Sequence, residues 1–258
     1  MTAPALSRAT PVWHGVEQVP LGWGPCVVTL GVFDGLHRGH ARLVQRAVRT
    51  GRARGLPVVL VTFDPHPARV VGLPRDTAQL TTVERRAELA GDLGVDAVCV
   101  LRFTPEFARL GPAEFVEQVL VGALRAAAVV VGANFTFGHR GAGDPALLRA
   151  LGERHGFTAE AVALLHAVAV PCSSTAVRTL LRAGDVHGAA RVLGRPHRVD
   201  GVADGGELVV AEGTAVPAPG HYAVRLACGR HTDLEVTADG RLLVDASGVE
   251  FLDRLEGA

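Results

Sequence analysis

The chain has 258 residues, 48% of them hydrophobic, which is enough for one large domain and one small one, each with its own core. Its 26 basic and 26 acidic residues balance, so no overall positive field exists to hold a nucleic acid through its phosphates. All 26 basic residues are arginine, which excludes a Walker A loop, a Schiff base and a lysine nucleophile. Any bound phosphate must be held by Arg, His, backbone N–H groups, helix N-termini or a metal ion.

The sequence contains no apolar run near the ~18 residues that a membrane-spanning helix needs. Residues 1–25 lack the basic start and apolar run of a secretory signal, so we treat them as an N-terminal extension and expect a cytoplasmic protein. The four cysteines are far apart and form no CxxC pair, which argues against a zinc site and a disulfide framework. The oligomeric state is left open.

From residue 26 to residue 193 the sequence alternates apolar, β-branched runs with amphipathic segments. Helices are predicted over 81–93, 113–124 and 185–193, between and after strands at 26–32, 58–63, 96–101, 128–132 and 159–165. This alternation predicts an α/β fold with a parallel sheet, whose ligands bind beyond the carboxyl ends of the strands. After Gly194 the pattern changes to short strands separated by turns, so we place a second, β-rich domain at 194–258.

The first predicted strand runs directly into a segment with two histidines, Gly31-Val32-Phe33-Asp34-Gly35-Leu36-His37-Arg38-Gly39-His40. A strand, a turn with glycines and a helix start are the parts of a phosphate-binding cradle. Because His37 and His40 are three residues apart, both imidazoles are predicted on one face of the first helical turn. Gly39 between them leaves room for a ligand to approach the backbone. The alternative is an ordinary helix start with solvated histidines or one buried histidine.

This segment resembles the HxGH signature of the nucleotidyltransferase superfamily, and the longer string GVFDGLHRGH resembles its prokaryotic FAD synthetase branch. Three further segments resemble that family in the same order along residues 26–196: Val61-Thr62-Phe63-Asp64-Pro65-His66-Pro67, Val131-Gly132-Ala133-Asn134-Phe135-Thr136-Phe137-Gly138 and Ser173-Ser174-Thr175-Ala176-Val177-Arg178. The resemblance implies a Rossmann-like sheet of the HxGH type. It also implies transfer of AMP from ATP to FMN, giving FAD and pyrophosphate.

The resemblance assigns roles to residues in each segment. It implies catalytic roles for His37, His40 and Arg178. Nucleotide binding would fall to Gly31, Phe33, Asp34, Gly39, Ser173, Ser174 and Thr175. Flavin binding would fall to Phe63, Asp64, Pro65, Asn134 and Phe137. Mg²⁺ is expected with ATP, but no carboxylate cluster marks a ligand set, so the metal ligands stay unknown.

Each assignment has an alternative reading. Ser174 and Thr175 are plausible caps of an ordinary surface helix with Arg178 in solvent. Asp34 and Asp64 can simply shape turns, the latter ahead of Pro65. Phe135 and Phe137 fit core positions as well as a ligand site.

The second domain resembles a riboflavin kinase module, which Gly194-Arg195-Pro196 would join as a linker. The family's GFPTAN motif is missing after Gly201, where Asp204-Gly205-Gly206 leads directly into an apolar strand. We therefore expect a shortened module without kinase activity. Two other functions stay open: a nucleotidyltransferase of this fold with another acceptor, and a non-catalytic regulator that binds flavin or nucleotide.

Overall fold

The computed structural model describes residues 9–163, 166–167 and 170–255. The chain folds into two compact units. Unit 1 comprises Met1–Val32, Ala41–Leu73 and Val83–Leu164, and unit 2 comprises Phe33–His40, Pro74–Thr82 and Leu165–Ala258. No helix in the described ranges is both long and apolar enough to cross a bilayer.

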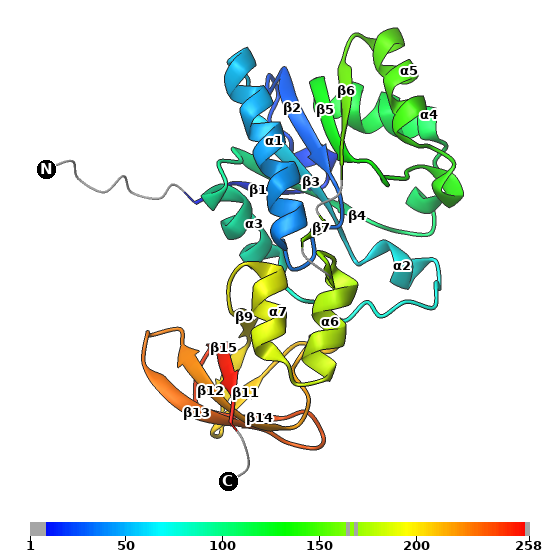
Figure 1. Ribbon diagram of the computed structural model, residues 1–258. Coiled ribbons are helices and arrows are strands. Elements are labelled where there is room, and N and C mark those ends of the chain that lie inside the picture. The colour runs from blue at the N-terminus through cyan, green and yellow to red at the C-terminus, as the bar shows by residue number, and fades with distance from the viewer. Residues whose placement is uncertain (1–8, 164–165, 168–169, 256–258) are drawn as a thin grey trace, which may run out of the picture. The chain divides into compact units, whose positions relative to one another are not determined.

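Unit 1 is built around a parallel sheet of six strands among its described residues (Figure 1). In spatial order they are β1 (Val12–His14), β4 (Ala97–Arg102), β3 (Val58–Asp64), β2 (Cys26–Leu30), β5 (Ala126–Gly132) and β6 (Thr158–Val162). All five residues of β2 are buried, as expected for a strand covered on both faces. The predicted α/β class is confirmed.

One detail of this sheet differs from the prediction. The three-residue strand β1 lies within the segment treated as an N-terminal extension, and it pairs in parallel with β4. The last two residues of the strand predicted over 159–165 lie outside the described residues.

The order of the strands locates the expected binding edge of the sheet. The chain passes from β2 to β3 and β4 on one side, then returns to β5 on the other side of β2 and continues to β6. The direction of winding therefore reverses between β2 and β5. In open parallel sheets, ligands bind beyond the carboxyl ends of the strands at such a reversal.

Two helices of this unit were predicted with bounds, over 81–93 and 113–124, and the structure has helical segments within two residues of these bounds. α1 buries Leu43, Val44, Ala47 and Val48. A Cβ on Gly51 of this helix would lie 2.6 Å from Val58 Cγ2, so glycine lets the helix pack closely on the start of β3. The helices are α1 (Arg38–Arg54), α2 (Pro67–Val70), α3 (Val83–Asp92), α4 (Pro112–Phe115), which continues as a π-helical segment (Val116–Ala123), and α5 (Pro145–His155). Short 3₁₀ segments are Val16–Gln18, Phe107–Arg109 and His139–Gly141.

Unit 2 contains an antiparallel sheet of seven strands among the residues described, which confirms the β-rich C-terminal domain (Figure 1, yellow to red). Its spatial order is β10 (Val202–Asp204), β11 (Glu207–Val209), β14 (Leu242–Leu243), β13 (His231–Val236), β12 (Gly220–Leu226), β15 (Gly248–Arg254) and β9 (His197–Asp200). The unit also contains α6 (Ser174–Arg182), α7 (Val186–Leu193) and the short pair β7 (His166–Ala167) and β8 (Val170–Pro171).

One hydrophobic core runs through unit 2. It joins Val177 and Leu181 of α6 and Val192 of α7 to Tyr222 and Phe251 of the sheet. Packing thus groups α6 and α7 with the β strands, whereas the sequence pattern places the boundary after residue 193. That boundary between sequence modules stays a prediction.

Candidate functional site

The two histidines of the motif lie together in unit 2. α1 begins at Arg38, and His37 immediately before it accepts a hydrogen bond on Nδ1 from the backbone N–H of His40, at 3.2 Å. The imidazole rings are stacked, with centroids 3.7 Å apart and planes 19° apart. His37 was predicted within the first helical turn; it instead caps the helix from the position before it. The two rings still share one location.

The environment of His37 fixes its protonation state. The side chain is buried, and its pKa is lowered from 6.5 to about 4, chiefly by burial and also by the charge of Arg195, while Asp34 opposes the shift. His37 is therefore neutral at pH 7. Because Nδ1 accepts the hydrogen bond from His40, the proton of the neutral ring is on Nε2. His37 can donate one hydrogen bond from Nε2.

Phe33 and Gly39 pack around this pair. The buried ring of Phe33 meets His40 edge to face, with centroids 5.1 Å apart. A Cβ on Gly39 would lie 3.1 Å from the ring of His37 and 3.2 Å from the carbonyl oxygen of Cys172. A side chain at this position would therefore be crowded by protein atoms. The ligand contact predicted for this position stays a prediction.

Asp34 and Arg178 form a buried ion pair, with Nη2 to Oδ2 at 2.6 Å and both side chains 4% exposed. Asp34 also accepts hydrogen bonds from the backbone N–H groups of Leu80 and Thr81 and from the Thr81 hydroxyl. Arg178 Nε donates to the carbonyl oxygen of Ala78 at 2.6 Å. Arg178 is therefore not a solvent-exposed residue. Two of its five N–H groups are used within the protein, and its predicted contact with phosphate stays a prediction.

The N-terminus of α6 differs in one respect from the prediction. Ser173 is the N-cap, since its side chain accepts from the backbone N–H of Ala176 at 3.1 Å. The prediction that Ser174 or Thr175 caps the helix is wrong. Ser174 instead donates its hydroxyl proton to the carbonyl oxygen of Asp34 at 2.8 Å, and Thr175 is exposed in the first turn. α6 is thereby tied to the histidine loop.

In unit 1, the other predicted residues lie at the carboxyl edge of the sheet. Gly31 follows β2, and exposed Asn134 follows β5, so they lie on either side of the reversal in strand order. Asp64 ends the neighbouring strand β3 and is exposed, as is Pro65. The sheet therefore brings these segments to the edge where a ligand is expected.

Aromatic side chains gather at this end of unit 1. Half-buried Phe63 meets Phe103 at a centroid distance of 5.7 Å and Phe107 at 6.4 Å. Phe137 is 7% exposed and belongs to the core, where its ring lies 2.7 Å from the position of a Cβ on Gly143. Packing thus favours the core reading of Phe137, whereas Phe63 can offer a face to a flat apolar ligand.

Two of these aromatic residues were not singled out from the sequence. Phe103 directly follows β4, and its backbone N–H donates to the carbonyl oxygen of Asp64 at 3.1 Å. Phe107 lies on the 3₁₀ segment just after it. Inspecting the residues after every predicted strand, β4 included, would have identified Phe103. Phe107 has no such signal.

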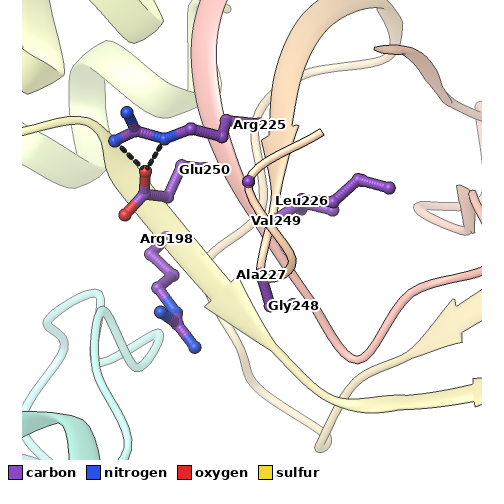
Figure 2. Close-up of a pocket in the computed structure, with 8 residues that line it drawn as sticks. Arg198, Arg225, Leu226, Ala227, Gly248, Val249 and Glu250 are labelled. Carbon is purple, nitrogen blue, oxygen red and sulfur yellow. Dashed lines mark hydrogen bonds and ion pairs between the residues drawn. The ribbon is translucent and has the colours of Figure 1, made fainter. Parts of the chain in front are cut away.

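A separate small cavity of about 140 Å³ lies in the β sheet of unit 2 (Figure 2). Figure 2 shows Arg225 paired with Glu250. The distance from Arg225 Nε to Glu250 Oε2 is 2.8 Å, and Arg198 pairs with Asp200, which lies outside the residues drawn. The cavity is smaller than the ~300–1,000 Å³ of typical ligand sites. Because its arginines are paired with nearby carboxylates, the cavity supplies no evidence for phosphate binding.

Within the described part of the chain, no three or more His, Cys, Asp or Glu residues gather so that they could hold a metal ion. Asp34, the carboxylate of the histidine loop, is engaged by Arg178 and by the N–H groups of Leu80 and Thr81. The groups that donate to Asp34 are those expected around a carboxylate with a structural role.

The sequence profile of the family described as FAD synthetase matches residues 21–176, which is more than half of the chain. The chain belongs to the FAD synthetase family. The matched range includes His37, His40 and the N-terminus of α6, together with the carboxyl edge of the parallel sheet. The family membership expected from the sequence is thus confirmed.

Similar proteins agree with this assignment. The bifunctional riboflavin kinase/FMN adenylyltransferase of Escherichia coli K12 is 36% identical over 196 residues, which span 76% of this chain but only 62% of that protein. The protein of the same name from Listeria monocytogenes is 32% identical over 227 residues, 83% of this chain and 72% of that protein. The crystal structure of a macrolide-efflux protein from Streptococcus pneumoniae has a TM-score of 0.81 over 97% of this chain and 92% of its own. At 24% identity, it shows the fold alone.

Proposed function

We propose that this protein is an FMN adenylyltransferase. An oxygen of the FMN phosphate attacks the α-phosphorus of ATP, the bond from the α-phosphorus to the bridging oxygen breaks, and FAD and pyrophosphate are formed. The observation that carries this proposal is the stacked pair His37 and His40 at the start of α1, in a chain of the FAD synthetase family. The curated relatives carry this activity in their names.

The histidine pair suits the chemistry of the transfer. Negative charge grows on the α-phosphate oxygens and on the leaving group, so fixed donors lower the barrier and no covalent residue is needed. Neutral His37 offers its Nε2–H as such a donor. The N-terminus of α1 adds a partial positive charge at the same place.

The segment from Ser173 to Arg178 would hold the leaving phosphates. The first turn of α6 presents backbone N–H groups, and Ser173 engages one of them, that of Ala176. Arg178 keeps N–H groups beyond those donated to Asp34 and Ala78. In unit 1, Phe63 would contact the flavin ring, and Asn134 would supply a donor and an acceptor.

Magnesium enters the proposal as part of the substrate. This ion prefers phosphate oxygens and water to an all-protein cage, and it would neutralise charge on the triphosphate. The chain's own residues then need only bind and orient the MgATP complex. That expectation agrees with a loop carboxylate, Asp34, that is already paired with Arg178.

The test is a pyrophosphate-release assay on the purified chain with MgATP and a panel of acceptors. FMN should give stoichiometric FAD and pyrophosphate, while phosphopantetheine, nicotinamide mononucleotide and glycerol phosphate should give neither. A folded His40→Ala variant should lose activity by orders of magnitude, which assigns the product to this site. Release of pyrophosphate with another acceptor would show that the chain catalyses a different nucleotidyl transfer on the same fold. Tight FMN or ATP binding without release would make it a regulator.

We also propose that the chain does not phosphorylate riboflavin. Directly after Gly201 comes the hairpin of β10 and β11, whose turn contains Gly205 and Gly206. This hairpin stands where the kinase motif of the family would be, and its residues supply no phosphate-binding arginine. Riboflavin, ATP and Mg²⁺ should therefore give no FMN in the same assay, and detection of FMN would contradict the proposal.

A further inference from the structure

Arg195, in the segment between α7 and β9, reaches back to the histidine loop within unit 2. Its Nη2 donates to the carbonyl oxygen of Gly35 at 2.6 Å, and its Nη1 donates to that of Leu36 at 3.1 Å. The preceding residue, Gly194, also lies close to the start of α1, since a Cβ at this position would be 3.1 Å from Arg38 Cγ. The linker thus packs against the residues on both sides of His37.

The loop that Arg195 grips is strained. Phe33, Gly35 and Leu36 have φ values of 52°, 76° and 36°, and two of these residues are not glycine. Non-glycine residues persist in this left-handed region only when surrounding contacts determine the conformation. The strain ends at Leu36, one residue before His37, so the same contacts decide where the His37 ring points.

The carbonyl groups of this loop show which contacts those are. The oxygen of Phe33 accepts from the backbone N–H of Leu36, and that of Asp34 accepts from the Ser174 hydroxyl. The other two, of Gly35 and Leu36, accept from Arg195. One side chain therefore holds two of the four consecutive carbonyl groups that lead into His37.

We propose that Arg195 is a positioning residue for the adenylyl transfer proposed above: its guanidinium fork holds the loop so that the His37 Nε2–H faces the α-phosphate. Lysine cannot reproduce this grip, because an ammonium group has no planar fork. The inference rests on the proposed function, and it gives the linker a role that is independent of kinase chemistry.

The anchoring of Arg195 comes from the β sheet. Two residues further on, the buried Nε2–H of His197 donates to the carbonyl oxygen of Ala215 at 2.8 Å. Val199 belongs to the core shared by α6, α7 and the strands. The sheet thus anchors the segment that carries Arg195, which gives a module without the kinase motif a role in the proposed transfer.

Arg195 also acts on His37 through its charge. The charged and titratable groups that face His37 in unit 2 are Arg195, Asp34 with its partner Arg178, and the ring of His40. Arg195 lowers the pKa of His37, and Asp34 raises it. Removal of the Arg195 charge should therefore raise the pKa of His37, an effect that depends on the guanidinium lying close to the ring.

The experiment compares Arg195→Met and Arg195→Lys with the control Arg191→Met, which changes an exposed arginine of α7. Pyrophosphate release from FMN and MgATP gives kcat and KM. NMR of labelled histidine, with the His37 signal assigned by its loss in His37→Asn, gives the pKa. Circular dichroism and thermal melting check the fold of each variant.

For Arg195→Met we expect kcat to fall about 10- to 100-fold with little change in KM for ATP, because a small misplacement of a donor acts on the transition state. The His37 pKa should rise. Arg195→Lys should keep the His37 pKa low but recover only part of kcat. Arg191→Met should match the wild type in both measurements.

An Arg195→Met variant with wild-type kcat and an unchanged His37 pKa would overturn the proposal. If that variant does not fold, folded Arg195→Lys decides, and full activity in it would show that the fork is not needed. If the wild type itself releases no pyrophosphate from FMN and ATP, the proposed function fails separately. The His37 titration then decides alone: a raised pKa in Arg195→Met together with a low one in Arg195→Lys supports the contact of Arg195 with the loop, and an unchanged pKa in Arg195→Met refutes it.

Discussion

The two ring nitrogens of His37 have separate roles in this structure. Nδ1 accepts from the backbone N–H of His40, as the side chain of an N-cap residue does. Nε2 keeps the proton and is the group that can reach a substrate oxygen. In the proposed mechanism, stability and catalysis therefore depend on different atoms of one side chain, so substitutions can separate them.

His37→Asn should separate the two roles most clearly. Asparagine is a good N-cap, so its side-chain oxygen can accept from the His40 N–H, but it has no donor where Nε2–H lies. We expect kcat to fall roughly 10²- to 10³-fold, the usual effect of removing one fixed donor, with the thermal midpoint little changed. Steady-state kinetics and calorimetry measure both quantities.

His37→Ala is the matched comparison, because alanine removes the cap as well as the donor. Its activity should equal that of His37→Asn, while its free energy of unfolding should be lower by about 1 kcal/mol. Wild-type kcat in either folded variant would remove His37 from the mechanism.

At the scale of elements, the ion pair of Asp34 and Arg178 joins the histidine loop to α6. It is almost fully buried, and Leu80 and Thr81 of the segment Pro74–Thr82 donate to the same carboxylate. A buried pair of this kind is not a large net source of stability, but breaking it leaves an uncompensated charge. The three segments should therefore loosen together when Asp34 is neutralised.

Asp34→Asn should lower the free energy of unfolding by about 3–5 kcal/mol, because Arg178 keeps its charge in a buried position. Asp76→Asn is the control, since Asp76 pairs with Arg182, whose side chain is 60% exposed, and such pairs contribute at most ~1 kcal/mol. Urea unfolding of the two variants measures the difference. Equal, small losses would show that the buried pair does not hold these segments together.

The elements themselves could be predicted where the local pattern is strong. β2, β3 and β4 are continuous apolar runs because both faces of the sheet are covered, and their bounds differ from the prediction by at most two residues. β1 was missed because a three-residue strand has no measurable periodicity. No sequence signal distinguishes the π-helical segment Val116–Ala123, which lies within the helix predicted over 113–124.

The contacts of the site could not be predicted, because they join residues far apart in the sequence. Ser173, Ser174 and Thr175 all suit an N-cap, and only the tertiary contact of Ser174 with Asp34 decides among them. The partners of Arg178 and Arg195 are 144 and 160 residues away, at Asp34 and Gly35. Local patterns identified the chemical groups, while their pairing required the fold.

At the scale of the whole molecule, the buried histidines couple stability to pH. His37 and His197 are both buried, and burial is the main cause that lowers the pKa of each from 6.5 to about 4. Between these two values the unfolded chain binds protons that the folded chain does not. The stability linked to each neutral histidine is therefore complete above pH 6.5 and is lost as pH falls toward 4.

Each histidine should lower the free energy of unfolding by on the order of 3 kcal/mol as the pH falls across this window, which is at most ~1.4 kcal/mol per pH unit. We expect the free energy of unfolding, from urea titrations at pH 7.0, 6.0 and 5.0, to fall as the pH is lowered. The free energy of unfolding of His37→Asn should fall less steeply with decreasing pH than that of the wild type, because asparagine does not titrate. The difference in slope should be at most that expected for the binding of one proton. The same slope in both proteins would mean that His37 is not held neutral, and its role as a donor from Nε2 would fail with it.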